Sequence, residues 1–223
     1  MLLKKNKKIL LNLFLFLLFG TFNNKNLNNF EIPKINNIKV SGMNNQENFE
    51  ILNSLEDIKI YSLFYLKKSK IEEFLNRYNY IEEFFVFKEY PSSLNIRLKK
   101  TIFLAYVKKD GKIFYLGSNR KLIKTKNHNN RLPYIYGNFD VEEFFNLKEI
   151  IEKSKLEFDE IKNLFFFPSK RWDIQTDSGV LIKLPKFKLK ESLDLYIDLL
   201  KKEEFTNTKI IDLRQSDQVI ING

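Results

Sequence analysis

The stretch "IEEFFVFKEYPSSLNIRLKKTIFLAYVKKDGKIFYLG", residues 81–117, consists of short runs in which apolar and polar side chains alternate. Such alternation with a period of two is typical of a β-strand with one buried face. The tetrapeptide "YPSS" at 90–93 is a turn sequence, and Asp110-Gly111 favours a two-residue hairpin turn. We therefore expect two strands joined by a turn, followed directly by a hairpin.

The residues before this stretch contain one strand pattern and two helix patterns. "INNIKVSG" alternates like a strand and ends at Gly42, whereas "NNQENFEILNSL" and "SKIEEFLNRY" place apolar side chains along one face of a helix. Together with the two strands that follow, the predicted order is strand, helix, helix, strand, strand. We expect residues 35–100 to form a first α+β domain.

The residues after this stretch predict a second domain, 101–223. Its patterns are the hairpin just described, a short strand "RLPYIYG", a helix "DVEEFFNLKEIIEK" and a second hairpin "RWDIQTDSGVLIKLP" that turns at Gly179. A further helix, "LKESLDLYIDLLKK", precedes the last segment. The predicted fold is α+β, with a mixed β-sheet and two helices in the second domain.

The last segment, "TKIIDLRQSDQVIING", is unusually apolar for a chain end. Ile211 and Leu213 alternate with Asp212 and Arg214, which predicts one half-buried terminal strand. Such a strand at a sheet edge can bind a partner by strand addition. The alternative is that this strand only completes its own sheet.

The first segment, "MLLKKNKKILLNLFLFLLFGTF", places lysines before an apolar run that starts at Ile9. The length of the run favours a cleaved signal peptide, but no pair of small residues follows it as a cleavage site, which favours an uncleaved anchor. We expect a tail at 1–8, a transmembrane signal anchor at 9–24 and a linker at 25–34. The lysines place the N-terminus in the cytoplasm.

The composition excludes several classes of protein. Of the 223 residues, 43% are hydrophobic and 30% charged, which indicates a folded chain. The net charge of +10 comes from scattered lysines, without the basic stripe that nucleic-acid binding requires, so we expect no nucleic-acid partner. Cys is absent, which excludes disulfides, Cys-ligated metals, a cysteine nucleophile and a lipoprotein anchor.

No catalytic constellation stands out. His128 is the one histidine and lies in a polar stretch, Ser178 belongs to a predicted turn, and the 7 glycines are too dispersed for a phosphate-binding loop. We therefore expect no catalytic, cofactor-binding or metal-binding residue, and no enzyme.

Three motifs resemble the FtsQ/DivIB family of cell-division proteins, notably its alphaproteobacterial members. They are "INNIKVSGM" after the linker, "VFKEYPSSLNIRLKKTIFLAYVKKDGKIFYLG" at the junction of the two domains, and "SKRWDIQTDSGVLIKLPK" followed by "IIDLRQSDQVIING". The chain departs from the family at "KKTIF", where a Glu-Arg-x-Pro is common. It departs again at Gln215, Asp217 and Gln218, where some members carry an aromatic residue and a Ser-Gly pair.

The resemblance implies a POTRA-like domain at 35–100 and an FtsQ-type β domain at 101–223. It implies a non-enzymatic scaffold in the bacterial inner membrane at the division septum, with the C-terminal domain in the periplasm. The implied partners are FtsB-like and FtsL-like coiled-coil proteins and other divisome membrane proteins. By position, the residues implied in partner binding are Arg214, Gln215, Ser216, Asp217, Gln218 and Val219. The residues implied in maintaining the fold are Trp172, Gly179, Asp212 and Leu213.

Two other functions remain open at this point. POTRA domains also occur in proteins of outer-membrane assembly and secretion, although no series of lipid-facing strands follows here. A periplasmic cell-wall enzyme on an anchor would need a nucleophile with its base, or a metal set, and neither pattern is present.

Overall fold

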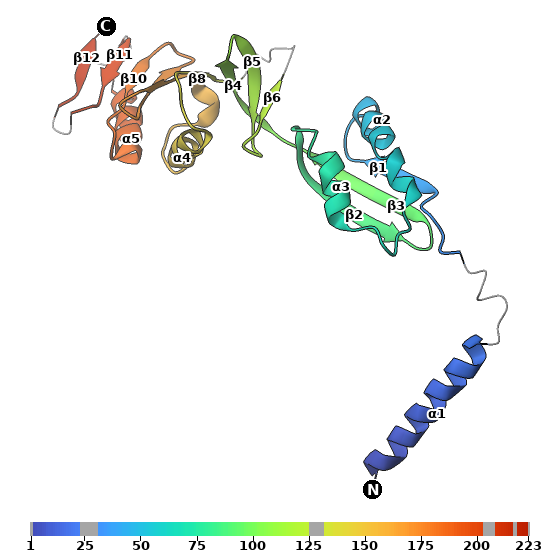
Figure 1. Cartoon of the computed structure of the whole chain (residues 1–223). Helices are drawn as coiled ribbons and strands as arrows, with labels where there is room; N and C mark the ends of the chain where they lie inside the picture. Colours follow the sequence, from blue (N-terminus) through green and yellow to red (C-terminus); the bar gives the residue numbers. More distant parts are fainter. Residues whose placement is uncertain (1, 23–30, 125–131, 203–207, 216–217, 223) are drawn as a thin grey trace. The chain divides into compact units, whose positions relative to one another are not determined.

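The computed structural model describes residues 2–22, 31–124, 132–202, 208–215 and 218–222. Within these ranges the chain divides into two compact units. The first comprises residues 1–40, 46–74 and 86–96, and the second comprises residues 41–45, 75–85 and 97–223. Helices and strands are coloured along the sequence in Figure 1.

The N-terminal helix α1 runs from Leu2 to Phe22 and therefore begins before the expected anchor at 9–24. The last two positions of that expected anchor, and most of the expected linker at 25–34, lie outside the described residues. Across the described ranges, no helix is both long enough and apolar enough to cross a membrane.

The elements that follow α1 come in the predicted order, strand, helix, helix, strand, strand, with one 3₁₀ segment added. They are β1 (Asn37–Ser41), α2 (Asn45–Ser54), η1 (Glu56–Ile60), α3 (Lys68–Leu75), β2 (Ile81–Glu89) and β3 (Ser93–Lys100). The three strands form a sheet in the order β1-β3-β2. Ile51, Ile58, Ile71 and Ile96 are fully buried, which shows that α2, η1, α3 and β3 all contribute to a core.

The remaining elements form a nine-stranded mixed sheet with two α-helices. They are β4 (Phe103–Lys109), β5 (Lys112–Gly117), β6 (Leu122–Lys124), β7 (Tyr134–Tyr136), α4 (Val141–Glu152), η2 (Phe158–Glu160), β8 (Ile161–Phe167), β9 (Arg171–Thr176), β10 (Leu181–Lys183), α5 (Leu189–Leu200), β11 (Ile210–Asp212) and β12 (Ile220–Asn222). The strand order is β12-β11-β10-β9-β8-β7-β4-β5-β6. The pairs β4–β7, β7–β8 and β10–β11 are parallel, and the other pairs are antiparallel.

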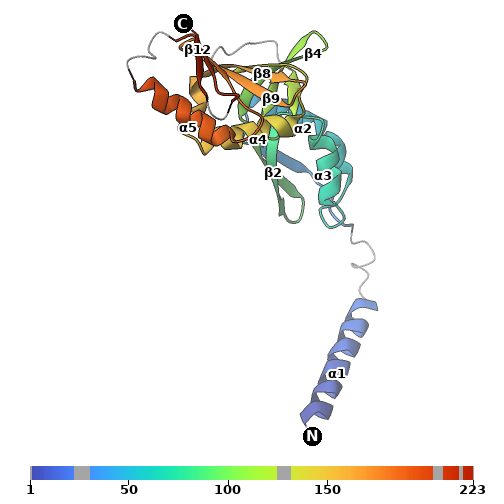
Figure 2. The ribbon, with the colours of Figure 1, turned by 90° about the vertical axis from the view of Figure 1, so that its left-hand side faces the viewer.

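Helices α4 and α5 lie on the same face of this sheet, as both views show (Figures 1 and 2). Leu193, Tyr196 and Leu199 of α5 recur at helical spacing and are buried, as is Phe144 of α4. These side chains belong to one core cluster with Trp172 and Ile211. The apolar stripe of each helix is therefore packed on the sheet.

The turns of the sheet use the backbone conformations that their residues favour. Asp110 and Gly111 both have positive φ, at 50° and 73°, as a two-residue hairpin turn between twisted strands requires. Gly137 ends β7 with φ at 105°, and a Cβ there would lie 2.1 Å from the carbonyl oxygen of Phe166. Only glycine fits that position without a backbone shift.

The prediction of one terminal strand is wrong, because the last segment forms two strands. β11 ends at Asp212, and β12 begins at Ile220 and runs back antiparallel to it. The described residues Leu213, Arg214 and Gln215 therefore do not continue β11 as a strand. The edge of the sheet is therefore formed by β12.

Candidate functional site

Strand β12 lies at one end of the nine-stranded sheet and exposes apolar side chains. In the strand order its neighbour is β11, and no described strand lies on its other side. Ile220 is 50% exposed and Ile221 is 40% exposed. At the opposite end of the same sheet, Ile123 of β6 is only 9% exposed. An apolar edge with unpaired backbone groups is a liability that proteins normally blunt, so β12 is unusual within this sheet.

The strand register assigns the two isoleucines to opposite faces of the sheet. Ile221 lies opposite Ile211, which is fully buried, and Ile220 lies opposite Asp212. Because directly opposed residues share a face, Ile221 continues the buried face and Ile220 continues the charged one. A strand added beside β12 would therefore cover an isoleucine on each face.

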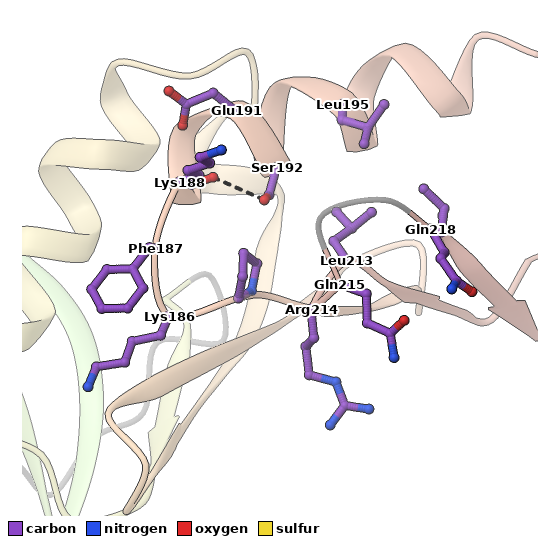
Figure 3. Close-up of a pocket in the computed structure, with 12 residues that line it drawn as sticks. Lys186, Phe187, Lys188, Glu191, Ser192, Leu195, Leu213, Arg214, Gln215 and Gln218 are labelled. Carbon is purple, nitrogen blue, oxygen red and sulfur yellow. Dashed lines mark hydrogen bonds between the residues drawn. The ribbon is translucent and has the colours of Figure 1, made fainter.

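A hollow of about 740 Å³ adjoins this end of the sheet. Its walls are the loop before α5, the first turns of α5 and the residues that connect β11 to β12 (Figure 3). Leu213 points toward α5, whereas Arg214 and Gln215 point to the other side of the connection. Phe187 in the loop is 73% exposed, and Leu195 on α5 is 43% exposed. The hollow therefore combines apolar walls with a basic and polar rim.

The loop before α5 is held by its own backbone. Lys188 has φ at 59°, in the left-handed region, which turns the chain into the helix. The Ser192 hydroxyl donates a hydrogen bond to the Lys188 carbonyl at 3.0 Å, and the Ser192 amide donates to the same oxygen at 3.1 Å. The side chain of Phe187 is thus presented to solvent by a fixed turn.

A row of alternating charges crosses the three strands next to β12. Lys183 on β10 lies opposite Asp173 on β9 and opposite Asp212 on β11. Arg171 donates to Asp173 at 3.3 Å, and the Nε of Arg214 donates to the two Asp212 oxygens at 2.8 and 2.9 Å. The two carboxylates are buried, so the flanking cations compensate them.

The two carboxylates of this row respond differently to their surroundings. Hydrogen bonds from the Arg214 side chain hold the pKa of Asp212 below its ordinary value, against the opposing effect of burial. Burial raises the pKa of Asp173, and the charge of Arg171 only partly offsets this. Arg214 therefore has a fixed anionic partner, while 42% of its side chain is exposed beside the hollow that it helps to line.

The residues implied in partner binding are only partly brought together. Arg214, Gln215, Gln218 and Val219 line the hollow. Ser216 and Asp217 lie outside the described residues.

The residues implied in maintaining the fold lie elsewhere in the sheet. Asp212 and Leu213 are buried at the end of β11, and Trp172 is buried between Phe139 and Phe166, with ring centroids 5.9 and 4.7 Å away. Gly179 lies in the turn between β9 and β10 with φ at 90°.

The sequence interpretation missed Phe187, Leu195, Ile220 and Ile221. For Phe187 a signal existed, because the tripeptide "KFK" places an aromatic residue between two lysines directly after a proline. The other three follow an ordinary apolar pattern, and their exposure becomes evident only from the packing of α5 and from the place of β12 at the end of the strand order.

Metal sites are not apparent in the described part of the chain, where no group of His, Asp and Glu side chains is arranged to hold an ion. His128, the one histidine, lies outside the described residues.

Comparison with known proteins gives consistent matches over most of the chain. Residues 34–100 match the family model described as "POTRA domain, FtsQ-type", and residues 97–214 match "Cell division protein FtsQ/DivIB, C-terminal". The cell division protein FtsQ of Rickettsia bellii is 25% identical over 192 residues, covering 84% of this chain and 72% of that protein. That of Rickettsia typhi is 25% identical over 194 residues, with the same coverage.

A solved structure is also similar to part of the chain. It is the major extracytoplasmic domain of the cell division protein DivIB from Geobacillus stearothermophilus, with 15% identity and a TM-score of 0.36. The similarity covers 48% of this chain and 96% of that one. The FtsQ/DivIB match at 97–214 alone spans more than half of the 223 residues, and the POTRA match directly precedes it. The chain belongs to the FtsQ/DivIB family of cell-division proteins.

Proposed function

We propose that this protein is a non-enzymatic scaffold of the bacterial divisome that binds an FtsB/FtsL-type coiled-coil subcomplex through the β12 edge. The observation that carries the proposal is the exposure of Ile220 and Ile221 on an edge strand that pairs with β11 on one side and with no described strand on the other. Family membership supports a role in cell division. The scaffold links earlier and later septal proteins without performing a reaction itself.

The binding mode follows from the physics of a sheet edge. A partner strand paired with β12 would satisfy its unpaired backbone groups, which gives affinity without demanding a particular side chain. The same strand would cover Ile220 and Ile221, each of which is close to half exposed. Such pairing would therefore satisfy the free backbone groups of the edge and cover its exposed apolar side chains at the same time.

The hollow beside β12 supplies selectivity. Its apolar walls, Phe187, Leu195 and Leu213, suit a partner's apolar side chain. Arg214 on its rim suits an acidic partner residue, because its guanidinium is already oriented by Asp212 and loses little freedom on binding. A partner strand paired with β12 would bring its neighbouring residues next to the hollow.

We also propose that α1 anchors the protein in the inner membrane, with the N-terminus in the cytoplasm and the sheet in the periplasm. Leu10, Phe16 and Phe19 are each more than 70% exposed, so the helix buries none of them within the protein. The apolar run from Ile9 to Phe22 rises by about 21 Å, which is short of a hydrocarbon core of about 30 Å. Snorkelling lysines and local thinning of the bilayer make up the difference.

The test of the binding mode is a proline scan along β12 in the full chain. Successive amides of a strand point to opposite sides of it. Proline at Ile220, Ile221 and Asn222 in turn therefore removes, alternately, an inward amide that faces β11 and an outward amide that faces away from it. We expect the variants that remove an outward amide to lose capture of an FtsB-type partner while their thermal unfolding midpoint stays near that of wild type. The variants that remove an inward amide should have a lower midpoint instead.

A matched control lies at the other edge of the same sheet. Lys124→Pro removes an amide from β6 and should leave capture unchanged. If all three β12 variants stay folded and capture the partner as well as wild type does, then β12 only completes its own sheet and the proposal is wrong.

A further inference from the structure

A second exposed apolar surface lies far along the chain from β12, in the first unit. The residues 61–66, here called the aromatic loop, connect η1 to the segment before α3. Phe64 is 59% exposed and Tyr65 is 69% exposed, whereas Leu63 and Leu66 on either side of them are buried. Tyr90 is 57% exposed, and its ring centroid lies 5.0 Å from that of Phe64. The loop therefore directs two leucines inward and aromatic rings outward.

The outward position of these rings is fixed by hydrogen bonds. The amides of Tyr65 and Leu66 donate to the Ser62 carbonyl at 3.1 and 3.0 Å, and the amide of Phe64 donates to the Ser62 hydroxyl at 3.3 Å. Lys88 donates through Nζ to the carbonyls of Leu63 and Leu66 at 2.6 and 2.7 Å. The exposure of Phe64 and Tyr65 is thus a consequence of a constrained backbone.

Lysines flank the aromatic loop on both sides. The stretch from Lys59 to Lys70 contains four lysines and no carboxylate. Three of the four form ion pairs with glutamates on the adjacent helical segments, and Lys67 forms none with any described carboxylate. A hollow of about 520 Å³ lies between Tyr61, Tyr65, Lys67 and Lys70, with Glu73 also lining it. The surface therefore combines exposed aromatic rings with three lysines that are paired with glutamates and with Lys67, whose charge no described carboxylate offsets.

The chain reaches this surface directly from α1. The amide of Ile35 donates to the Tyr61 carbonyl at 3.0 Å, and Lys34 pairs with Ser62 as an isolated antiparallel bridge. The aromatic loop thus adjoins Lys34 and Ile35, which follow α1 in the sequence. The twelve residues from Phe22 to Lys34 span at most about 40 Å, so the loop stays within that distance of the end of α1.

We propose that the aromatic loop docks on anionic lipid headgroups of the membrane in which α1 is anchored. Tyr65 and Tyr90 would enter the interfacial region, where rings with an apolar body and a polar tip are favoured, and the apolar ring of Phe64 would be buried beside them. Lys67, which forms no ion pair with a described carboxylate, would face the headgroup phosphates, which attract basic residues. Docking would fix the side on which the first unit meets the bilayer.

The absence of Cys permits a test on the full chain with a single label. Ser69 is exposed beside the loop and is not one of the aromatic residues, so Ser69→Cys can carry a fluorophore. The labelled chain is reconstituted in phosphatidylcholine vesicles with or without phosphatidylglycerol, and quenching by a lipid-borne nitroxide near the headgroups is measured. We expect quenching in the anionic vesicles that falls by about threefold or more without phosphatidylglycerol.

Variants separate the loop from other causes of quenching. The double change Phe64→Ser and Tyr65→Ser should abolish most of the quenching. Phe49→Ser, at a residue of α2 that is also 62% exposed, should leave it unchanged. Lys67→Glu reverses a surface charge without touching the core and should weaken quenching in anionic vesicles only.

The proposal rests on the membrane anchor proposed above, and flotation of the vesicles distinguishes the two. If the chain floats with the vesicles but its label is not quenched, the docking proposal is wrong and the anchor proposal stands. The aromatic loop would then be a surface for a protein partner. Quenching that survives the double variant, or that is equal without phosphatidylglycerol, would also overturn it. A chain that fails to float with vesicles would overturn the anchor and the docking together.

Discussion

Replacing Ile220 and Ile221 together with threonine tests how much of the partner's binding energy comes from the apolar side chains of β12. Threonine keeps the branched Cβ that suits a strand, so the change removes apolar surface and leaves the backbone pairing possible. The two residues are 50% and 40% exposed in the free protein, and a partner strand would cover most of that surface.

The magnitude follows from this exposed fraction. Complete burial of an isoleucine side chain contributes about 1.5–3 kcal/mol, and somewhat less than one whole side chain remains to be buried across the pair. Because threonine retains one methyl group, the expected loss is about 1–2 kcal/mol, which is about five- to thirtyfold in Kd. The domain itself should lose a similar amount of stability, about 1–2 kcal/mol, since the other half of each side chain is already buried.

The assay is titration calorimetry of the detergent-solubilised full chain with the extracytoplasmic part of an FtsB-type partner. Ile102→Thr is the matched control, because Ile102 is 66% exposed and does not belong to β12. Its Kd should equal that of wild type. A folded double variant whose Kd stays within about twofold of wild type would refute the burial of these isoleucines by the partner.

Three further outcomes are expected. Gly137→Ala should lower the free energy of unfolding by about 3 kcal/mol or more in urea denaturation, because the added Cβ meets a backbone carbonyl. Gly179→Ala has open space around it and should lower the free energy of unfolding by only about 1–2 kcal/mol, so equal losses in the two variants would contradict this reasoning. Asp212→Asn should destabilise the protein by about 1–2 kcal/mol at neutral pH. The lowered pKa of Asp212 contributes stability above its ordinary value of 3.8, and this stability is lost as the pH falls through the folded-state pKa, so the difference from wild type should shrink in acid. A difference that stays constant with pH would contradict the role of its ion pair. Lys88→Met should lower stability by about 1–3 kcal/mol by leaving two carbonyls without their donor, and limited proteolysis should then cut the aromatic loop sooner than in wild type.

Several elements could be predicted from the sequence because their signals are local. The Asp110-Gly111 turn is determined by two residues that tolerate positive φ, and the helix at 189–200 is determined by apolar residues at helical spacing. The helix α1 begins before the expected anchor at 9–24. Lysine is a good helix former, so the basic tail continues the helix back to Leu2 instead of preceding it.

The candidate site could be predicted only in part, because it depends on contacts between distant segments. β11 and β12 have three residues each, which is too short for a periodic pattern, and their separation becomes evident only when they pair. The row formed by Asp173, Lys183 and Asp212 depends on the register of three strands. No pattern within one strand contains that information.

Hydrogen exchange of the backbone amides from Ile220 to Asn222 tests the central claim most directly. In the free protein, the amides of β12 that point away from β11 have no strand to pair with among the described residues, and they should exchange rapidly. On addition of the FtsB-type partner, we expect those outward amides to become protected in alternation with the inward ones. If the partner binds and the exchange of these amides does not change, then β12 does not accept a strand and the partner binds elsewhere.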